Sequence, residues 1–177
     1  MTAIVGLARG DAVYIGGDSA GTSGWNLSVR ADPKVFRNKQ YLFGFTSSFR
    51  MGQLIRYSLD LPTPKGDLDR FMVTKFIDGL RDCLKSGGYA RKEEEQELGG
   101  TFLVGVRGRL YTIQDDYQVG SAADGYAAVG CGDQIALGAL YATAGRGVRP
   151  KARVRLALSA AERFSAGVRG PFTCKKL

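Results

Sequence analysis

The chain of 177 residues contains no histidine. This absence excludes the Ser-His-Asp and Cys-His arrangements, in which an imidazole is the general base. It also excludes the H-E-x-x-H metalloprotease motif and zinc sites built with histidine. Any catalysis by this chain therefore needs another base, and we predict neither a metal nor another cofactor.

Cysteine is also scarce, and its placement excludes a further class of protein. Cys83, Cys131 and Cys174 lie far apart, and no two of them form a C-x-x-C pair. An odd, scattered set is typical of reduced thiols in a cytosol rather than of a disulfide framework. Each cysteine is first interpreted as a small buried hydrophobic residue.

Long apolar runs are missing as well. The sequence has no stretch of about 18 apolar residues, which excludes a helix that spans a bilayer. The first residues lack the basic lead and long apolar run of a secretory signal peptide. We therefore predict a cytoplasmic protein with no membrane partner.

The chain does have enough apolar residues for one compact domain. Its length and its hydrophobic content of 44% fit a single domain over residues 1–177. Apolar residues that alternate, or recur at every third or fourth position, predict strands and amphipathic helices. The predicted strands cover residues 3–8, 12–15, 34–37, 41–46, 101–106, 110–113, 126–129 and 172–174. The predicted helices run from Ser47 or Ser48 to Leu59, and over residues 67–85, 133–144 and 151–166.

Two segments between these elements are less regular. Residues 19–32 predict a loop or an irregular hairpin around Trp25, and the charge run at residues 91–97 predicts a solvated turn or short helix. Tight turns between the strands favour antiparallel pairing. We therefore expect an α+β fold, a four-layer αββα sandwich of two antiparallel sheets with outer helices.

Basic residues outnumber acidic ones, which gives a formal net charge of +8. One interpretation is a nucleic-acid-associated protein; the other is a solvated basic face or a surface for an acidic partner. The sequence has no RNP motif or zinc finger, so nucleic acid is the less favoured partner. The basic residues gather in two groups, one at Lys34, Arg37 and Lys39, the other at Arg146, Arg149, Lys151, Arg153 and Arg155.

A hydroxyl nucleophile can be activated without histidine when it belongs to the N-terminal residue, because the α-amine can then be the base. A free α-amine has a pKa near ~7.7–8.0, whereas a lysine titrates near ~10.4. A neighbouring cation lowers the pKa of the amine, and a carboxylate can position that cation. The smallest such set is an N-terminal threonine, a lysine and an aspartate.

The sequence contains these three residues at regular spacing. Thr2 follows Met1 directly, and methionine aminopeptidase normally trims before a residue as small as threonine. Asp18 comes 16 residues after Thr2, at the broken end of the second predicted strand, and Lys34 comes 16 residues after Asp18. The first hairpin returns the chain toward its origin, so we expect Asp18 close to Thr2.

Each of these residues also has an ordinary interpretation. Asp18 follows two glycines and could be a turn former. Lys34 follows Asp32-Pro33 and could be a strand-edge lysine. The three residues together, at these spacings, favour an active site.

The residues around this set resemble a known family. The segments TAIVG at 2–6, YIGGDS at 14–19 and KV at 34–35 resemble the opening of proteasome β subunits and HslV-type peptidases, which are N-terminal-nucleophile threonine hydrolases. GFTS at 44–47 resembles their next strand and turn, and GCGD at 130–133 resembles their Ser-Gly-Gly turn before a late helix. The likeness extends over nearly the whole chain in element order and is specific up to Ser47.

The resemblance implies a role for each matched residue. Thr2 would be the nucleophile and its α-amine the general base, while Lys34 would lower the pKa of that amine and Asp18 would hold Lys34. The backbone N–H of Ser47 or Ser48 would face the developing oxyanion, and Cys131 would take the place of the family's serine.

The sequence departs from the family at three places. The family's turn glycine near Ser47 is not glycine here, and Cys131 is a weaker hydrogen-bond donor than the serine it replaces. The family's late aspartate, which belongs to a cluster that supports the amine, has no clear match. Glu162 and Arg163 occupy that part of the last predicted helix, with Ser165 close by.

The resemblance implies a threonine peptidase that cleaves polypeptides once Met1 has been removed. It also implies a homo-oligomeric ring and a separate ATP-driven unfoldase, because this chain has no G-x-x-x-x-G-K-[ST] phosphate loop. Two alternatives within this fold are an inactive shell or assembly subunit, in which Met1 is retained, and a hydrolase of small amides.

Overall fold

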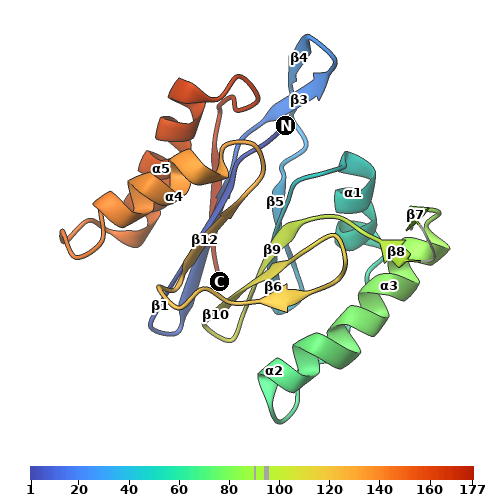
Figure 1. Ribbon diagram of the computed structural model, residues 1–177. Coiled ribbons are helices and arrows are strands. Elements are labelled where there is room, and N and C mark those ends of the chain that lie inside the picture. Colours follow the sequence, from blue (N-terminus) through green and yellow to red (C-terminus); the bar gives the residue numbers. More distant parts are fainter. Residues whose placement is uncertain (90, 94–95) are drawn as a thin grey trace.

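The computed structural model describes residues 1–89, 91–93 and 96–177, and the side chains of residues 91–93, 96 and 97 are left undescribed. Two antiparallel sheets face each other, and helices cover the outer face of each (Figure 1). The predicted α+β sandwich is confirmed.

The first sheet has the order β12-β1-β2-β13 and the second β11-β10-β9-β6-β5. The strands of the first sheet are β1 (Ile4–Arg9), β2 (Ala12–Gly17), β12 (Tyr126–Val129) and β13 (Thr173–Lys176). Those of the second are β5 (Val35–Asn38), β6 (Tyr41–Phe45), β9 (Phe102–Val106), β10 (Arg109–Ile113) and β11 (Val119–Gly120).

Three apolar clusters separate the four layers. The alternation of a β-strand sends neighbouring side chains to opposite faces. Ala3 and Val5 therefore pack against α4 (Asp133–Ala142) and α5 (Pro150–Phe164), whereas Ile4 between them packs between the two sheets. The third cluster lies between the second sheet and the helices on its outer face. The start of the chain is thus clamped between the second sheet and α5.

The helices on the second sheet follow the predicted pattern with one exception. Ser48 caps α1 (Phe49–Tyr57) by accepting a hydrogen bond from Arg50 N–H at 3.1 Å. The predicted helix over residues 67–85 divides into α2 (Leu68–Phe71), a π-helical turn η1 (Met72–Phe76) and α3 (Ile77–Ser86).

The π-helical turn follows from the spacing of the buried residues. An α-helix has about 3.6 residues per turn, so an apolar side chain at every fourth position drifts around its surface. A π-helix, bonded from i to i+5, holds more residues in a turn and corrects the drift. Five apolar residues recur at every fourth position of this segment, and all of them are buried on the same side: Leu68, Met72, Phe76, Leu80 and Leu84.

Three other segments differ from or refine the sequence predictions. The charge run forms strands β7 (Arg91–Glu93) and β8 (Gln96–Leu98), so a turn or short helix was wrong there; positions 94 and 95 lie outside the described residues. Backbone pairing overrides the weak strand propensity of lysine and glutamate.

Residues 19–32 form a regular hairpin of β3 (Ala20–Ser23) and β4 (Asn26–Val29), which projects from the body (Figure 1). The short strand β11 was not predicted.

Burial also changes the charge pattern read from the sequence. Lys34 and Arg153, one from each basic group, are buried rather than part of a solvated face. Arg153 donates hydrogen bonds to Leu140 O and Thr143 Oγ1 and so ties α5 to the end of α4. Within the described ranges, no helix is long and apolar enough to cross a membrane.

We predict that Gly44→Ala destabilises the sandwich. A Cβ atom at Gly44 would lie 2.6 Å from Ile4 Cγ2 and 2.7 Å from Ile15 Cγ2, and both isoleucines are fixed between the sheets. Overpacking of this kind lowers the free energy of unfolding by about 1–3 kcal/mol, measurable by urea denaturation. Gly120→Ala, where a Cβ would meet nothing within 4 Å, is the matched control and should change stability by less than about 0.5 kcal/mol. Equal effects at the two positions would contradict the packing described here.

Candidate active site

The first hairpin brings Asp18 beside the start of β1. Ile4 pairs with Gly17 across the hairpin, so Asp18, which directly follows β2, lies opposite Ala3. Asp18 N–H donates to Ala3 O at 3.3 Å, and Ala3 N–H donates to Asp18 Oδ1 at 3.1 Å. The carboxylate is therefore held next to Thr2 by the register of the sheet.

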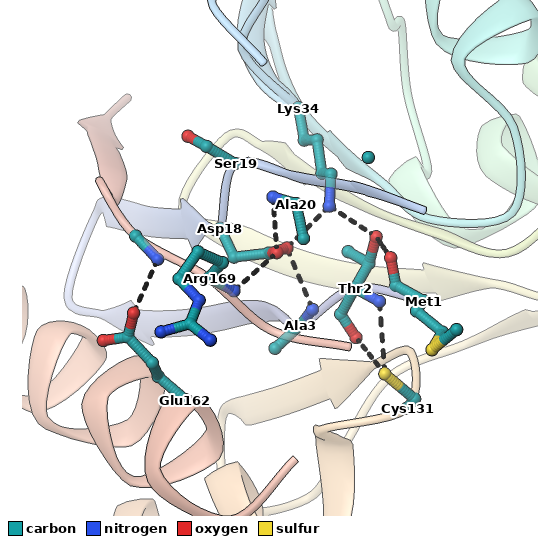
Figure 2. A network of polar contacts seen from close by, with 12 residues as sticks. Met1, Thr2, Ala3, Asp18, Ser19, Ala20, Lys34, Cys131, Glu162 and Arg169 are labelled. Atoms are coloured by element: carbon teal, nitrogen blue, oxygen red, sulfur yellow. Dashed lines mark hydrogen bonds and ion pairs between the residues drawn. The ribbon is translucent and has the colours of Figure 1, made fainter. Parts of the chain in front are cut away.

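Lys34 reaches the same point from the second sheet, just before β5. Its Nζ lies 2.7 Å from Asp18 Oδ1 and 2.6 Å from Thr2 Oγ1 (Figure 2). The side chains of Lys34 and Asp18 are 1% and 0% exposed. The structure thus brings together the three residues singled out by their spacing, and the turn-former and strand-edge interpretations do not account for this contact.

A segment that the sequence did not indicate completes the carboxylate's environment. Asp18 Oδ2 accepts hydrogen bonds from Ala20 N–H at 2.9 Å and from Arg169 N–H at 3.2 Å. Arg169 O in turn accepts from Ser19 N–H at 2.7 Å. The loop between α5 and β13 therefore fixes Asp18 through backbone atoms, which any residue type provides, so no side-chain signal could have identified it.

Two opposing effects act on the pKa of Lys34 in this buried pair. Burial lowers the pKa of the Lys34 ammonium, and the charge and hydrogen bond of Asp18 oppose that shift. The ammonium donates to Thr2 Oγ1, so it can stabilise negative charge that develops on that oxygen.

Ser47 keeps the backbone conformation that glycine favours. Its φ is +66°, in the left-handed region, and Ser48 N–H donates to Thr46 O at 2.8 Å across it. This is a γ-turn with Ser47 at its centre. Because Ser48 N–H is engaged, Ser47 N–H is the better oxyanion donor of the two; it has no hydrogen-bond acceptor among the described residues. Both residues and Thr2 line a pocket of about 70 Å³.

Cys131 lies on the other side of Thr2. Its Sγ accepts a hydrogen bond from Thr2 N–H at 3.2 Å and lies 3.5 Å from both Thr2 O and Ser165 Oγ (Figure 2). The expectation that every cysteine is buried was wrong, since Cys131 is exposed and Cys83 and Cys174 are half-buried. Cys131 therefore occupies the position facing the nitrogen of the nucleophile.

The other residues of the late cluster take different positions. Glu162 Oε1 accepts from Gly170 N–H at 2.8 Å, which anchors the loop that holds Asp18 (Figure 2). Arg163 is exposed on α5. Ser165 contacts Cys131, so a Ser-Cys pair, with no carboxylate in direct contact, faces Thr2 nitrogen.

Met1 determines the chemical state of this centre. With Met1 attached, Thr2 nitrogen belongs to a peptide bond and has no basic lone pair, and Thr2 Oγ1 donates to Met1 O. Met1 also lines the pocket beside Thr2. The proposed base therefore exists only after Met1 is removed. No group of three or more Cys, Asp or Glu in the described part of the chain is placed to hold a metal.

Three of the solved structures that match this chain each cover 99% of it. BPH (bacterial proteasome homologue) from Thiobacillus denitrificans, in complex with epoxomicin, is 18% identical with a TM-score of 0.81, and the match covers 99% of this chain and 97% of that chain. A second structure of BPH from the same organism is 19% identical with a TM-score of 0.80 over the same shares. Eukaryotic HslV from Trypanosoma brucei is 19% identical, with a TM-score of 0.71 over 99% of this chain and 98% of that chain.

The chain has the proteasome-like fold of N-terminal-nucleophile hydrolases. The resemblance read from the first 47 positions is thus confirmed at the level of the fold. No model of a known protein family matches this sequence, and no curated protein matches it either. At 18–19% identity these structures show the fold alone.

We predict that Asp18→Asn leaves a buried ammonium without its counter-ion. Breaking a buried pair in this way costs about 3–5 kcal/mol of unfolding free energy. The pKa of Lys34 should fall further, because Asp18 raises it. As the pH rises toward about 10.4, the pKa of lysine in an unfolded chain, the unfolded chain then binds more protons than the folded one, so the stability lost relative to the wild type shrinks.

The pH dependence is measured by chemical denaturation at a series of pH values. Adding Lys34→Met to Asp18→Asn removes the buried charge, so the rise of stability with pH that Lys34 causes in the single variant should disappear. An Asp18→Asn chain whose stability follows the same pH profile as the wild type would show that Lys34 is not charged in the folded state.

Proposed function

We propose that the chain, once Met1 is removed, is a peptidase that hydrolyses peptide bonds with Thr2 as nucleophile. One observation carries this proposal: a buried ammonium, Lys34 Nζ, lies between Thr2 Oγ1 at 2.6 Å and Asp18 Oδ1 at 2.7 Å. A buried lysine that donates to both its counter-ion and a threonine hydroxyl at a potential N-terminus is placed to activate that hydroxyl.

The first step is attack of Thr2 Oγ1 on the carbonyl carbon of the substrate. The α-amine takes the hydroxyl proton as the C–O bond forms, and Lys34 stabilises the charge that develops on Oγ1. The α-amine then gives its proton to the leaving nitrogen as the C–N bond breaks, which leaves an ester on Thr2. A water molecule, deprotonated by the same amine, hydrolyses the ester and restores the hydroxyl.

The groups on either side of Thr2 serve different atoms of the reaction. Ser47 N–H faces the developing oxyanion, a contact typically worth ~2.7–4 kcal/mol of barrier for one donor. Cys131 Sγ lies 3.2 Å from Thr2 nitrogen and orients the amine. A thiol is a weak hydrogen-bonding group, so Cys131 contributes position more than charge stabilisation.

Polypeptides are the proposed substrates. Support comes from the fold and from the similar BPH structure in complex with epoxomicin. We further propose that the chain works as a homo-oligomeric ring and that a separate ATP-driven unfoldase feeds it, since its own sequence has no phosphate loop.

The second candidate is an inactive assembly subunit of the same fold. The hydrogen bond from Thr2 Oγ1 to Met1 O favours it as long as Met1 stays attached, because the hydroxyl proton is then held by a neighbouring carbonyl. Nucleic-acid binding gains no support, since burial removes Lys34 and Arg153 from the two basic groups.

We predict that a peptide epoxyketone labels Met1-free protein once, on Thr2, as read by intact mass and peptide mapping. The epoxyketone reacts with both the hydroxyl and the amine of an N-terminal threonine, so protein that retains Met1 should stay unlabelled. Thr2→Ala should abolish labelling, and Lys34→Ala should slow it by at least about a hundredfold, as is typical when acid–base assistance is lost.

Thr74→Ala, a hydroxyl on the far helix η1, is the matched control and should label at the wild-type rate. Labelling that persists in Thr2→Ala would refute the assignment of the nucleophile. Unlabelled Met1-free protein, folded by circular dichroism, would favour the inactive subunit.

A further inference from the structure

The peptide bond between Met1 and Thr2 is engaged on both sides in the folded chain. Its N–H, from Thr2, donates to Cys131 Sγ at 3.2 Å, and its carbonyl, from Met1, accepts from Thr2 Oγ1 (Figure 2). The next carbonyl, Thr2 O, accepts from Gly132 N–H at 3.3 Å. The polar atoms that a hydrolase would have to bind around this bond are therefore already paired within the protein.

Close packing surrounds the residues that follow Met1. Thr2 is 4% exposed and residues 3–4 are 0% exposed, although Met1 itself is 57% exposed. Gly130 has a φ of +102°, and a Cβ atom there would lie 2.3 Å from Thr2 O, so the backbone of this turn lies directly against Thr2. A hydrolase that reaches the Met1 side chain therefore has no room for the walls of its own cleft around Thr2.

These residues lead directly into an inner strand of the first sheet. β1 lies between β12 and β2, and Ile4 pairs with Val129 on one side and with Gly17 on the other. The apolar cluster that contains Ala3 joins the outer face of the strand to α4 and α5. Pulling the first residues free would break both ladders at this end and expose the cluster, so we expect the open form to be rarely populated.

Removal of Met1 is a hydrolysis. Water adds its hydroxyl to the Met1 carbonyl carbon, the C–N bond breaks, and the hydrogen passes to Thr2 nitrogen, which becomes a free amine. An aminopeptidase carries out this class of reaction on a chain that it can bind. Where cleavage requires folded structure to open, its rate follows the population of the open form. For the bond after Met1, that population is set by the packing around Thr2 and β1.

The groups that enclose the bond come late in the sequence. Thr2 has to wait for β12 and for residues 130–132, which follow it by more than 120 positions. A ribosome adds about 5–20 residues per second, so Thr2 stays uncovered for roughly 6–25 s during synthesis. The chain thus offers the bond to a hydrolase first and encloses it afterwards.

We infer that Met1 is removed only before the sandwich closes, by an aminopeptidase that acts on the unfolded chain, and that folding then fixes the fraction of chains with a free Thr2 amine. A chain that folds with Met1 attached keeps it, because the bond is paired and enclosed. The inference goes beyond the proposed peptidase activity: it concerns how the amine is produced, and it holds for this bond whatever Thr2 does afterwards.

The test uses Met1-bearing protein made by cell-free translation without methionine aminopeptidase. That enzyme is then added to the folded protein, to a peptide of residues 1–9, or at increasing times after refolding from urea begins, and loss of one methionine is read by intact mass. We expect the folded protein to lose Met1 at least about a thousandfold more slowly than the peptide, in line with the small open fraction of folded proteins. In the refolding samples the yield of Met1-free protein should fall as the addition is delayed.

Three results would overturn the inference. The first is loss of Met1 from the folded protein at a rate within about tenfold of the peptide. The second is a yield that does not depend on when the enzyme is added during refolding. The third is loss of Met1 from the folded protein with no enzyme added.

A pair of glycine variants tests whether the turn at Gly130 closes the bond. Gly130→Ala places a Cβ atom against Thr2 O, whereas Gly145→Ala has the same kind of positive φ, +71°, in the loop between α4 and α5 with nothing within 4 Å. Folded Gly130→Ala should lose Met1 about tenfold faster or more than folded Gly145→Ala, because overpacking at Thr2 favours the open form. Equal rates in two variants that are both folded by circular dichroism would contradict the enclosure of Thr2 described here.

The mass readout keeps this inference separate from the proposed function. If folded protein retains Met1 but Met1-free protein does not react with an epoxyketone, the proposed function alone fails. If Met1-free protein reacts but the folded chain loses Met1 as fast as the peptide, the order of events inferred here alone fails.

Discussion

The buried contact between the Lys34 ammonium, the Asp18 carboxylate and the Thr2 hydroxyl is the interaction on which the rest of the structure depends. Two charges with almost no exposure are stable only when each has partners with good geometry. Asp18 meets this condition through three backbone N–H groups, from Ala3, Ala20 and Arg169, in addition to Lys34. Both sheets and the loop after α5 must therefore be in place before the charges can be buried, so the centre forms with the whole sandwich.

The centre is polarised along one line through Thr2. On one side lie the ammonium and the γ-turn at Ser47, which suit a developing oxyanion. On the other side lies Cys131, which accepts from Thr2 N–H and is contacted in turn by Ser165 Oγ. A free amine there would be influenced mainly by Lys34, so a single lysine both assists the nucleophile and tunes its base.

The sequence was informative where function depends on side chains at fixed spacing along regular strands. Thr2, Asp18 and Lys34 could be singled out because a hairpin and a crossing strand constrain where they meet. Arg169 could not, since it acts through a backbone N–H that any residue type has. Ser47 was flagged as a departure because its side chain differs from glycine, yet the backbone keeps φ at +66°, and residue type alone does not reveal that conformation. The π-helical turn was missed because apolar residues at every fourth position were interpreted as one continuous α-helix over residues 67–85.

Met1 decides whether this arrangement is chemically complete. The peptide bond between Met1 and Thr2 replaces an amine by an amide, which removes the base while leaving the nearby side chains where catalysis needs them. The Met1 carbonyl also accepts from Thr2 Oγ1, so the hydroxyl is engaged by the very group whose removal would free it. Gly167 leaves room for Met1, because a Cβ atom at Gly167 would lie 2.4 Å from Met1 Cβ. The folded, Met1-bearing chain is thus a formed site without its proton acceptor, and one cleavage changes its chemistry with little need for a change of fold.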